Sequence, residues 1–259
     1  MNDITAYFGS SHWLHQVFQT LPVRKVKGRT KWTHRHATWV ELLNRLVYVE
    51  SRNELIGLLA LEYLQRLSVV KHFKEQPFTA PLDLWPSGFE LDDSPRIGEY
   101  TPDLIAETKT GEKYVIEIKS ARYISRQMER DFELWKDKFL EYDLKYLVWT
   151  DRDPLATPLR QNLLELRRAA VQYIEADEIL RLVDLLSRQG PLPIWALYGQ
   201  DLDRELISHA AWQGKVFFPL HEPFGRHTIV SLDRTTDLEK ILFGAEPDME
   251  VWWNSLEAA

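Results

Sequence analysis

The sequence from Tyr100 to Lys119 reads YTPDLIAETKTGEKYVIEIK, and it contains the clearest strand pattern of the chain. Its two ends, Tyr100–Glu107 and Lys113–Lys119, each read as a β-strand. Between them lies Lys109–Glu112, which contains the glycine that a tight turn prefers. The stretch therefore predicts a hairpin of two adjacent strands.

Three charged side chains meet at the end of this predicted hairpin. Asp103 begins the first strand, and Glu117 and Lys119 lie two residues apart on the second. Side chains two apart on a strand point to one face, so Glu117 and Lys119 share a face. The apolar residues that alternate with them point to the opposite face, which we expect to pack on the core. Folding the turn brings Asp103 opposite the end that carries Glu117 and Lys119.

Hydrolysis of a phosphodiester calls for this combination of two carboxylates and one ammonium. Mg2+ prefers hard oxygen ligands, and the bound ion stabilises the phosphate and acidifies a water. A lysine ammonium can orient that water and neutralise developing charge. We therefore predict a catalytic set of Asp103, Glu117 and Lys119. We expect Mg2+, or Mn2+ in its place, to bind between Asp103, Glu117 and the backbone carbonyl of Ile118.

Each half of this pattern also has an ordinary structural explanation. A Pro-Asp pair is common in turns, and an alternating Glu-Ile-Lys on a strand is often a solvated face. The two halves together favour a catalytic site, because Asp103 and Glu117 lie fourteen residues apart on adjacent predicted strands. An upstream helical glutamate adds weight to this interpretation.

That glutamate is Glu54, near the start of a predicted helix over Ser51–Leu67 with leucines at helical spacing. We predict that Glu54 belongs to the catalytic set and is associated with the metal. Two alternatives stay open. Ser51 and Glu54 also form the S-x-x-E pattern of a capping box. In addition, Glu50 and Glu62 compete with Glu54 for the role of the helical acid.

The rest of the chain predicts elements on both sides of the hairpin. An amphipathic helix over Ile124–Tyr142 leads to a short buried strand over Tyr146–Thr150. Strand, helix and strand in this order indicate a crossover unit with parallel outer strands. Farther on, more helices precede two strands, Val216–Leu220 and Thr228–Leu232, and this order indicates a winged helix.

Composition narrows the classes of function. The 259 residues contain no cysteine, which excludes a disulfide scaffold, a cysteine nucleophile and a thiolate zinc site. The net charge of −7 argues against a protein that coats nucleic acid non-specifically. No apolar run approaches the ~20 residues that span a membrane. The N-terminus also lacks the features of a signal peptide, so we expect a cytoplasmic protein with no membrane partner.

Residues 22–36 form a basic arm, since this segment contains basic residues and no acidic one. Such an arm can track a DNA backbone, dock on a partner protein or be a solvated surface segment. We predict that the arm contacts DNA. The residues assigned to this contact are Arg24, Lys25, Lys27, Arg29 and Lys31.

Several of these motifs together resemble the TnsA endonuclease subunit of heteromeric transposases. The phrase Gln-Pro ahead of Tyr-Thr-Pro-Asp is more specific than a bare PD-(D/E)XK match. The resemblance covers roughly residues 45–240. The motifs that carry it are Ser51–Glu54, Phe73–Pro77, Tyr100–Asp103, Val115–Lys119, Leu147–Asp151 and the helix around Asn162 and Leu163.

The resemblance implies a specific activity and specific partners. A subunit of this family cuts one strand at the 5′ ends of a transposon. A partner transposase of the RNase H type cuts the other strand and joins it to the target, and an AAA+ regulator controls both. Carried over, Asp103 and Glu117 bind Mg2+, Lys119 is the catalytic lysine and Glu54 is the helical acid. Some family members carry glutamine at the position of Glu117, although glutamate is the more usual nuclease ligand.

We therefore expect an α/β fold, a restriction-endonuclease-like mixed sheet flanked by helices, with a C-terminal winged-helix-like domain. The expected divisions are an N-terminal segment with the basic arm (1–45), a PD-(D/E)XK nuclease domain (46–173) and a winged-helix-like domain with an acidic tail (174–259). The expected function is Mg2+-dependent cleavage of DNA at transposon ends. A stand-alone restriction or repair nuclease of the same fold, and an inactive DNA- or protein-binding subunit, are the alternatives.

Overall fold

A computed structural model describes residues 16–19, 22, 36–78, 80–81, 99–234 and 238–244. Its contacts divide the chain into two compact units that are not continuous in sequence. The first unit comprises Met1–Glu54, Lys71–Ile118 and Ser125–Val148, and the second comprises Leu55–Val70, Lys119–Ile124 and Trp149–Ala259.

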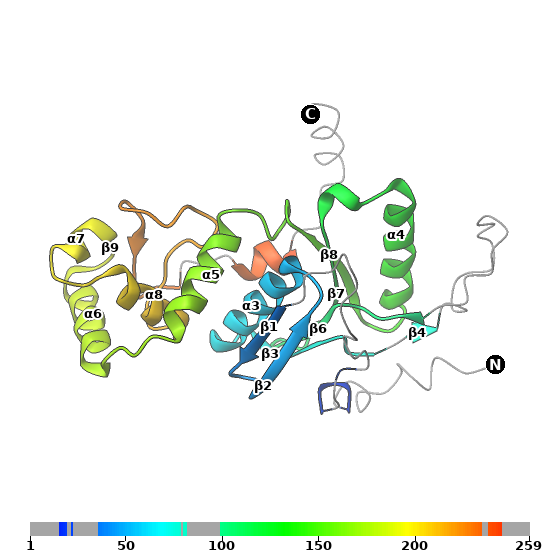
Figure 1. The fold of residues 1–259 in the computed structure, drawn as a ribbon, viewed down its shortest axis with the longest axis horizontal. Helices are drawn as coiled ribbons and strands as arrows, with labels where there is room; N and C mark the ends of the chain where they lie inside the picture. Colours follow the sequence, from blue (N-terminus) through cyan, green and yellow to red (C-terminus); the bar gives the residue numbers. More distant parts are fainter. Residues whose placement is uncertain are drawn as a thin grey trace. The chain divides into compact units, whose positions relative to one another are not determined.

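A mixed sheet of four strands, ordered β3-β6-β7-β8, is the centre of an α/β fold (Figure 1). This confirms the predicted fold class at the level of a mixed sheet accompanied by helices. The four strands are β3 (Val70–Glu75), β6 (Leu104–Thr108), β7 (Lys113–Lys119) and β8 (Lys145–Thr150).

The predicted hairpin is present as β6 and β7. The two strands pair antiparallel, with Leu104 opposite Ile116 and Glu107 opposite Lys113. In the turn Gly111 has φ of +90°, a left-handed conformation that suits glycine. The first strand begins at Leu104 rather than at Tyr100, because Pro102 has no N–H to contribute to a ladder.

Tyr100 belongs instead to a separate two-stranded sheet. Its strand β5 (Glu99–Tyr100) pairs antiparallel with β4 (Ala80–Pro81). The start of the predicted strand is therefore wrong by four residues. As a consequence Tyr100 is held beside the hairpin rather than within it.

The helix predicted after the hairpin is α4 (Arg126–Leu140), which lies alongside β7 and β8 in Figure 1. Ser125 caps its N-terminus by accepting a hydrogen bond from the Met128 amide at 3.2 Å. On its inner face Trp135 and Phe139 are buried in one hydrophobic core cluster with Ile105 and Val115. The amphipathic pattern thus identified both the helix and its buried face.

The elements ahead of the sheet include a second hairpin and one long helix. Strands β1 (His36–Val40) and β2 (Arg45–Val49) pair antiparallel. Helix α3 (Arg52–Arg66) agrees with the helix predicted over Ser51–Leu67. A single 3-10 turn, η2 (Ala121–Tyr123), follows β7.

The C-terminal part is mainly helical. Its two predicted strands around residues 216–232 do not form a two-stranded ribbon of their own. β10 (Ile229–Val230) pairs antiparallel with β9 (Leu192–Pro193), and only an isolated bridge joins Phe217 to Ser231. The prediction missed β9 because two residues leave no periodic signal. The other elements are α5 (Leu159–Ala170), α6 (Ala176–Gln189), α7 (Ile194–Tyr198), α8 (Arg204–Trp212) and the π-helical turn η3 (Lys240–Gly244).

Within the described ranges, no helix is long and apolar enough to cross a membrane.

Candidate functional site

Asp103 and Glu117 face each other across the end of the hairpin. The antiparallel register pairs Leu104 with Ile116, so the next position along the ladder sets Asp103 opposite Glu117. The Asp103 carboxylate is fixed there, because its Oδ2 accepts a hydrogen bond from the Ile118 amide at 2.7 Å. The sequence prediction that these two carboxylates converge therefore agrees with the geometry.

Glu117 is not on a solvated face. Only 5% of the residue is exposed, and every residue from Tyr114 to Ile118 is buried. The apolar face of this strand was expected to pack on the core, and the face of Val115 and Glu117 is buried as well, because α4 covers it. A carboxylate buried in this way needs partners that satisfy its oxygens.

One such partner is Tyr100, whose hydroxyl donates to Glu117 Oε2 at 2.7 Å. The Tyr146 hydroxyl lies 3.1 Å from the Tyr100 hydroxyl. A phenol has a single proton, and the shorter bond to the carboxylate takes that of Tyr100. The two tyrosine hydroxyls are also hydrogen-bonded to each other, which links Tyr146 through Tyr100 to Glu117.

Both tyrosines are held in their protonated form. Burial raises the pKa of Tyr100 well above its usual value, and the negative charge of Glu117 raises it further. Burial likewise raises the pKa of Tyr146, and the nearby charges of Glu117, Asp103 and Asp131 add to the rise. The carboxylates of Asp103 and Glu117 thus act together on one buried tyrosine.

Sequence reasoning missed both tyrosines as site residues. The Tyr100 ring stacks on Trp135, with centroids 4.4 Å apart, and the Tyr146 ring stacks on Phe139. Their rings belong to the core beneath α4, and an aromatic residue in such a pattern reads as a core residue. The one available signal was the place of Tyr100, three residues ahead of Asp103 in the quoted motif.

Lys119 ends β7, two residues beyond Glu117 on the same face of the strand, and is partly exposed. Asp151 fixes the direction of the chain directly after Lys119. Its carboxylate accepts hydrogen bonds from the Ser120 hydroxyl at 2.9 Å and from the Ala121 amide at 2.8 Å. Asp151 therefore holds the segment that follows Lys119, and sequence reasoning had assigned it no role.

Glu54 makes the hydrogen bonds of a helix cap. Its amide donates to Ser51 Oγ at 3.1 Å, and its Oε2 accepts from the Glu50 amide at 2.9 Å. The competing Glu62 is fully buried and pairs with Arg66 in the same helix. Among the described residues, no three acidic or histidine side chains form a group that could hold a metal. The structure thus brings Asp103 and Glu117 together, without a third such side chain.

A buried polar segment adjoins Asp103 on the other side. Gln76, at φ of +40°, donates its amide to the Asp103 carbonyl at 2.8 Å. Glu75 accepts two hydrogen bonds from the Arg45 guanidinium. Lys74 donates to a backbone carbonyl, and burial lowers its pKa to about 8. This segment belongs to the motif around Gln-Pro, and its partners suit a structural support for the strand end.

The DNA contacts predicted for the basic arm stay a prediction. Its five predicted DNA contacts lie outside the described residues. They are Arg24, Lys25, Lys27, Arg29 and Lys31.

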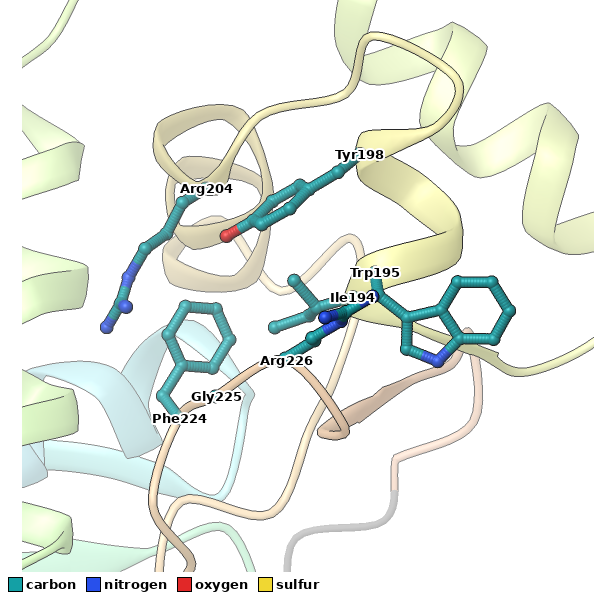
Figure 2. A pocket seen from close by; sticks show the side chains of 7 residues that line it. All are labelled: Ile194, Trp195, Tyr198, Arg204, Phe224, Gly225 and Arg226. Atoms are coloured by element: carbon teal, nitrogen blue, oxygen red, sulfur yellow. The ribbon is translucent and has the colours of Figure 1, made fainter.

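A separate pocket of about 490 Å³ lies in the C-terminal part (Figure 2). The Arg204 guanidinium lies over the Phe224 ring and is paired with Glu165. In Figure 2 the Tyr198 hydroxyl points toward the side of Arg204 and Phe224, whereas the Trp195 ring points the other way. No acidic residue is among the described residues that line the pocket. These are Ile194, Trp195, Tyr198, Arg204, Phe224, Gly225 and Arg226.

In comparisons with known proteins, no protein-family model and no curated protein matches the chain.

Proposed function

We propose that this chain is a Mg2+-dependent DNA endonuclease. The observation that carries the proposal is the placement of Asp103 directly opposite Glu117 at the end of the hairpin, with Lys119 following on the same face. The alternating motif on β7 is no solvated surface, because Glu117 is buried. Burial of a carboxylate is costly, and facing carboxylates repel, so this pair favours a bound cation.

The donor set fits Mg2+ or Mn2+. Asp103 and Glu117 offer carboxylate oxygens, and the Ile118 carbonyl is a third oxygen in the same segment. When bound, the ion would stabilise the negative charge that develops on a phosphate and lower the pKa of a water. Asp103 and Glu117 would hold the ion. The Lys119 ammonium would orient the attacking water and neutralise the developing charge.

The biological setting of the proposal comes from the resemblance to TnsA-like subunits. Under it, the chain cuts the 5′ strand at transposon ends, beside an RNase H-type transposase and an AAA+ regulator. The α/β core with a mixed sheet is compatible with a restriction-endonuclease-like domain. The order α6, β9, α7, α8 and β10, with β9 paired to β10, supports a winged-helix-like C-terminal part.

The test is a nicking assay on transposon-end DNA, with and without the partner transposase. We expect strand-specific nicks at the 5′ ends with Mg2+ or Mn2+ and none with a chelator. Ca2+ should bind without supporting cleavage. Nicking of DNA that lacks the ends, equally well and without a partner, would instead assign a stand-alone nuclease.

One observation favours the runner-up, an inactive DNA- or protein-binding subunit. Glu54 serves as a helix cap, and no third acidic side chain joins Asp103 and Glu117 among the described residues. Under this alternative the chain binds DNA or its partner normally but never cuts. Absence of nicks in the complete transposition system, with the partner's strand cut as usual, would establish it.

A further inference from the structure

We propose that Tyr100 is a positioning residue, whose hydroxyl, backed by that of Tyr146, sets the orientation of the Glu117 carboxylate. The inference rests on the proposed function, in which Glu117 holds a divalent cation. It starts from two contacts between the side chains: 2.7 Å from Tyr100 to Glu117 and 3.1 Å between the two tyrosines.

The hydroxyl of Tyr100 and its ring do different things. The ring stacks on Trp135 at 4.4 Å and tilts against Phe139, so it contributes to the core whatever its substituent. A phenylalanine would make the same contacts. The buried hydroxyl is therefore explained only by its polar partners, Glu117 and Tyr146, since an unpaired one would be costly.

A fixed carboxylate matters for a metal ligand. The terminal torsion of a glutamate is soft, so its two oxygens rotate easily unless a partner holds one of them. Tyr100 holds Oε2 of Glu117, and the Ile118 amide holds Oδ2 of Asp103. Each of the two carboxylates is thus held by a hydrogen bond at one of its oxygens. Outer partners of this kind orient metal ligands and tune their affinity.

The second tyrosine extends the arrangement across the sheet. Tyr146 lies on β8, the neighbour of β7, and its ring packs against Phe139 and Phe132. Its hydroxyl is hydrogen-bonded to that of Tyr100, which restricts where the Tyr100 hydroxyl can lie relative to Glu117. The Tyr146 hydroxyl acts through Tyr100, so its removal should have the smaller effect.

The experiment is a calorimetric titration of the full chain with Mn2+, comparing wild type and Tyr100→Phe. We expect the Mn2+ affinity of Tyr100→Phe to fall roughly 10- to 100-fold, as for other partners of metal ligands. Nicking should fall at limiting Mn2+ and recover largely at saturating Mn2+. A purely structural role would shift the thermal unfolding of the metal-free protein and leave the Mn2+ affinity unchanged.

Tyr114→Phe is the matched control. Tyr114 is buried on β7, the strand that carries Glu117. Its hydroxyl donates to Glu112 at 3.1 Å, toward the turn of the hairpin. The Tyr114→Phe variant should lose the hydrogen bond to Glu112 with no change in Mn2+ affinity. Tyr146→Phe keeps the direct bond between Tyr100 and Glu117, and we expect its affinity to fall by only a few fold.

The outcomes separate this inference from the proposed function. Wild-type protein that binds no Mn2+ would overturn the proposed function and the inference with it. Wild type that binds Mn2+, beside a Tyr100→Phe variant of equal affinity, would overturn the inference alone. Should Tyr100→Phe not fold, Tyr146→Phe decides: a fall in affinity supports the positioning role, and wild-type affinity with Tyr146→Phe overturns it.

Discussion

The end of the β6–β7 hairpin and the pocket beside α7 differ in what they offer to a ligand. At the hairpin end two carboxylates face each other, each oriented by a hydrogen bond, and a lysine follows on the same face. The pocket has a volume of about 490 Å³, but no acidic residue lines it among those described. The pocket is therefore not the better candidate for hydrolysis.

One charged side chain of the pocket, Arg204, is already engaged in packing. Arg204 is paired with Glu165 and covers one face of Phe224, whose ring also stacks on Phe218 at 4.3 Å. Tyr198 and Trp195 contribute half-exposed rings. Aromatic walls of this kind suit contact with another surface, whereas cleavage of a phosphodiester needs charge placed against charge.

The adjoining helix α8 also differs from a helix that reads DNA. Every residue from Leu206 to Trp212 is buried, and Trp212 stacks on Tyr63 of α3. A recognition helix must expose a face to enter the major groove. Helix α8 is therefore used for packing, in contrast to the charged hairpin end.

The largest effect is expected from removing a charge at the hairpin end. Asp103→Asn keeps an oxygen that can accept the hydrogen bond from the Ile118 amide, so the protein should fold. The substitution removes a charged ligand of the metal. Nicking should fall by roughly 10²–10³-fold or more. Asp103→Ala is the poorer choice, because it leaves the buried amide of Ile118 without this acceptor.

Lys119→Ala extends this prediction to the transposition products. The partner's strand should still be cut and joined, while the 5′ strand stays attached to donor DNA. Replication would then convert simple insertions into cointegrates, which sequencing of the products detects. If simple insertions persist at the wild-type ratio, this chain is not the nuclease that cuts the 5′ strand. The alternative of an inactive subunit would then be favoured.

A smaller effect is expected at Glu54, where the cap and the catalytic role can be separated. Glu54→Gln keeps an oxygen for the Glu50 amide, so stability should change by less than about 1 kcal/mol. If Glu54 is the helical acid, nicking should fall about tenfold or more, because its charge is lost.

Ser51→Ala is the matching control for the cap. It removes the acceptor of the Glu54 amide and should cost about 1 kcal/mol of unfolding free energy, measured by denaturant titration. Its nicking rate should stay at the wild-type level. Wild-type nicking by Glu54→Gln would restrict Glu54 to the capping role.

The smallest effect is expected in the pocket. Tyr198→Ala and Arg226→Ala alter exposed lining side chains, so nicking should stay within about twofold of wild type. The same assay on transposon-end DNA measures it. A tenfold loss in both variants would reverse the comparison and tie the pocket to the reaction.

The local features of this protein could be predicted from its sequence. Alternation with period two and a glycine at a turn gave β6 and β7, and helical spacing of apolar residues gave α3 and α4. The facing positions of Asp103 and Glu117 followed from the hairpin, because its register depends on residues only fourteen apart. Each of these features is encoded in residues that are near one another along the chain.

The surroundings of those carboxylates depend instead on contacts between segments that are far apart along the chain. Tyr146 reaches the site from a strand twenty-nine residues beyond Glu117, and α4 covers the face that the alternation of β7 left to solvent. The pairing of β9 with β10 joins residues more than thirty apart. Such contacts depend on how separate elements pack, and the periodicity of one segment carries no information about which other segment will cover it.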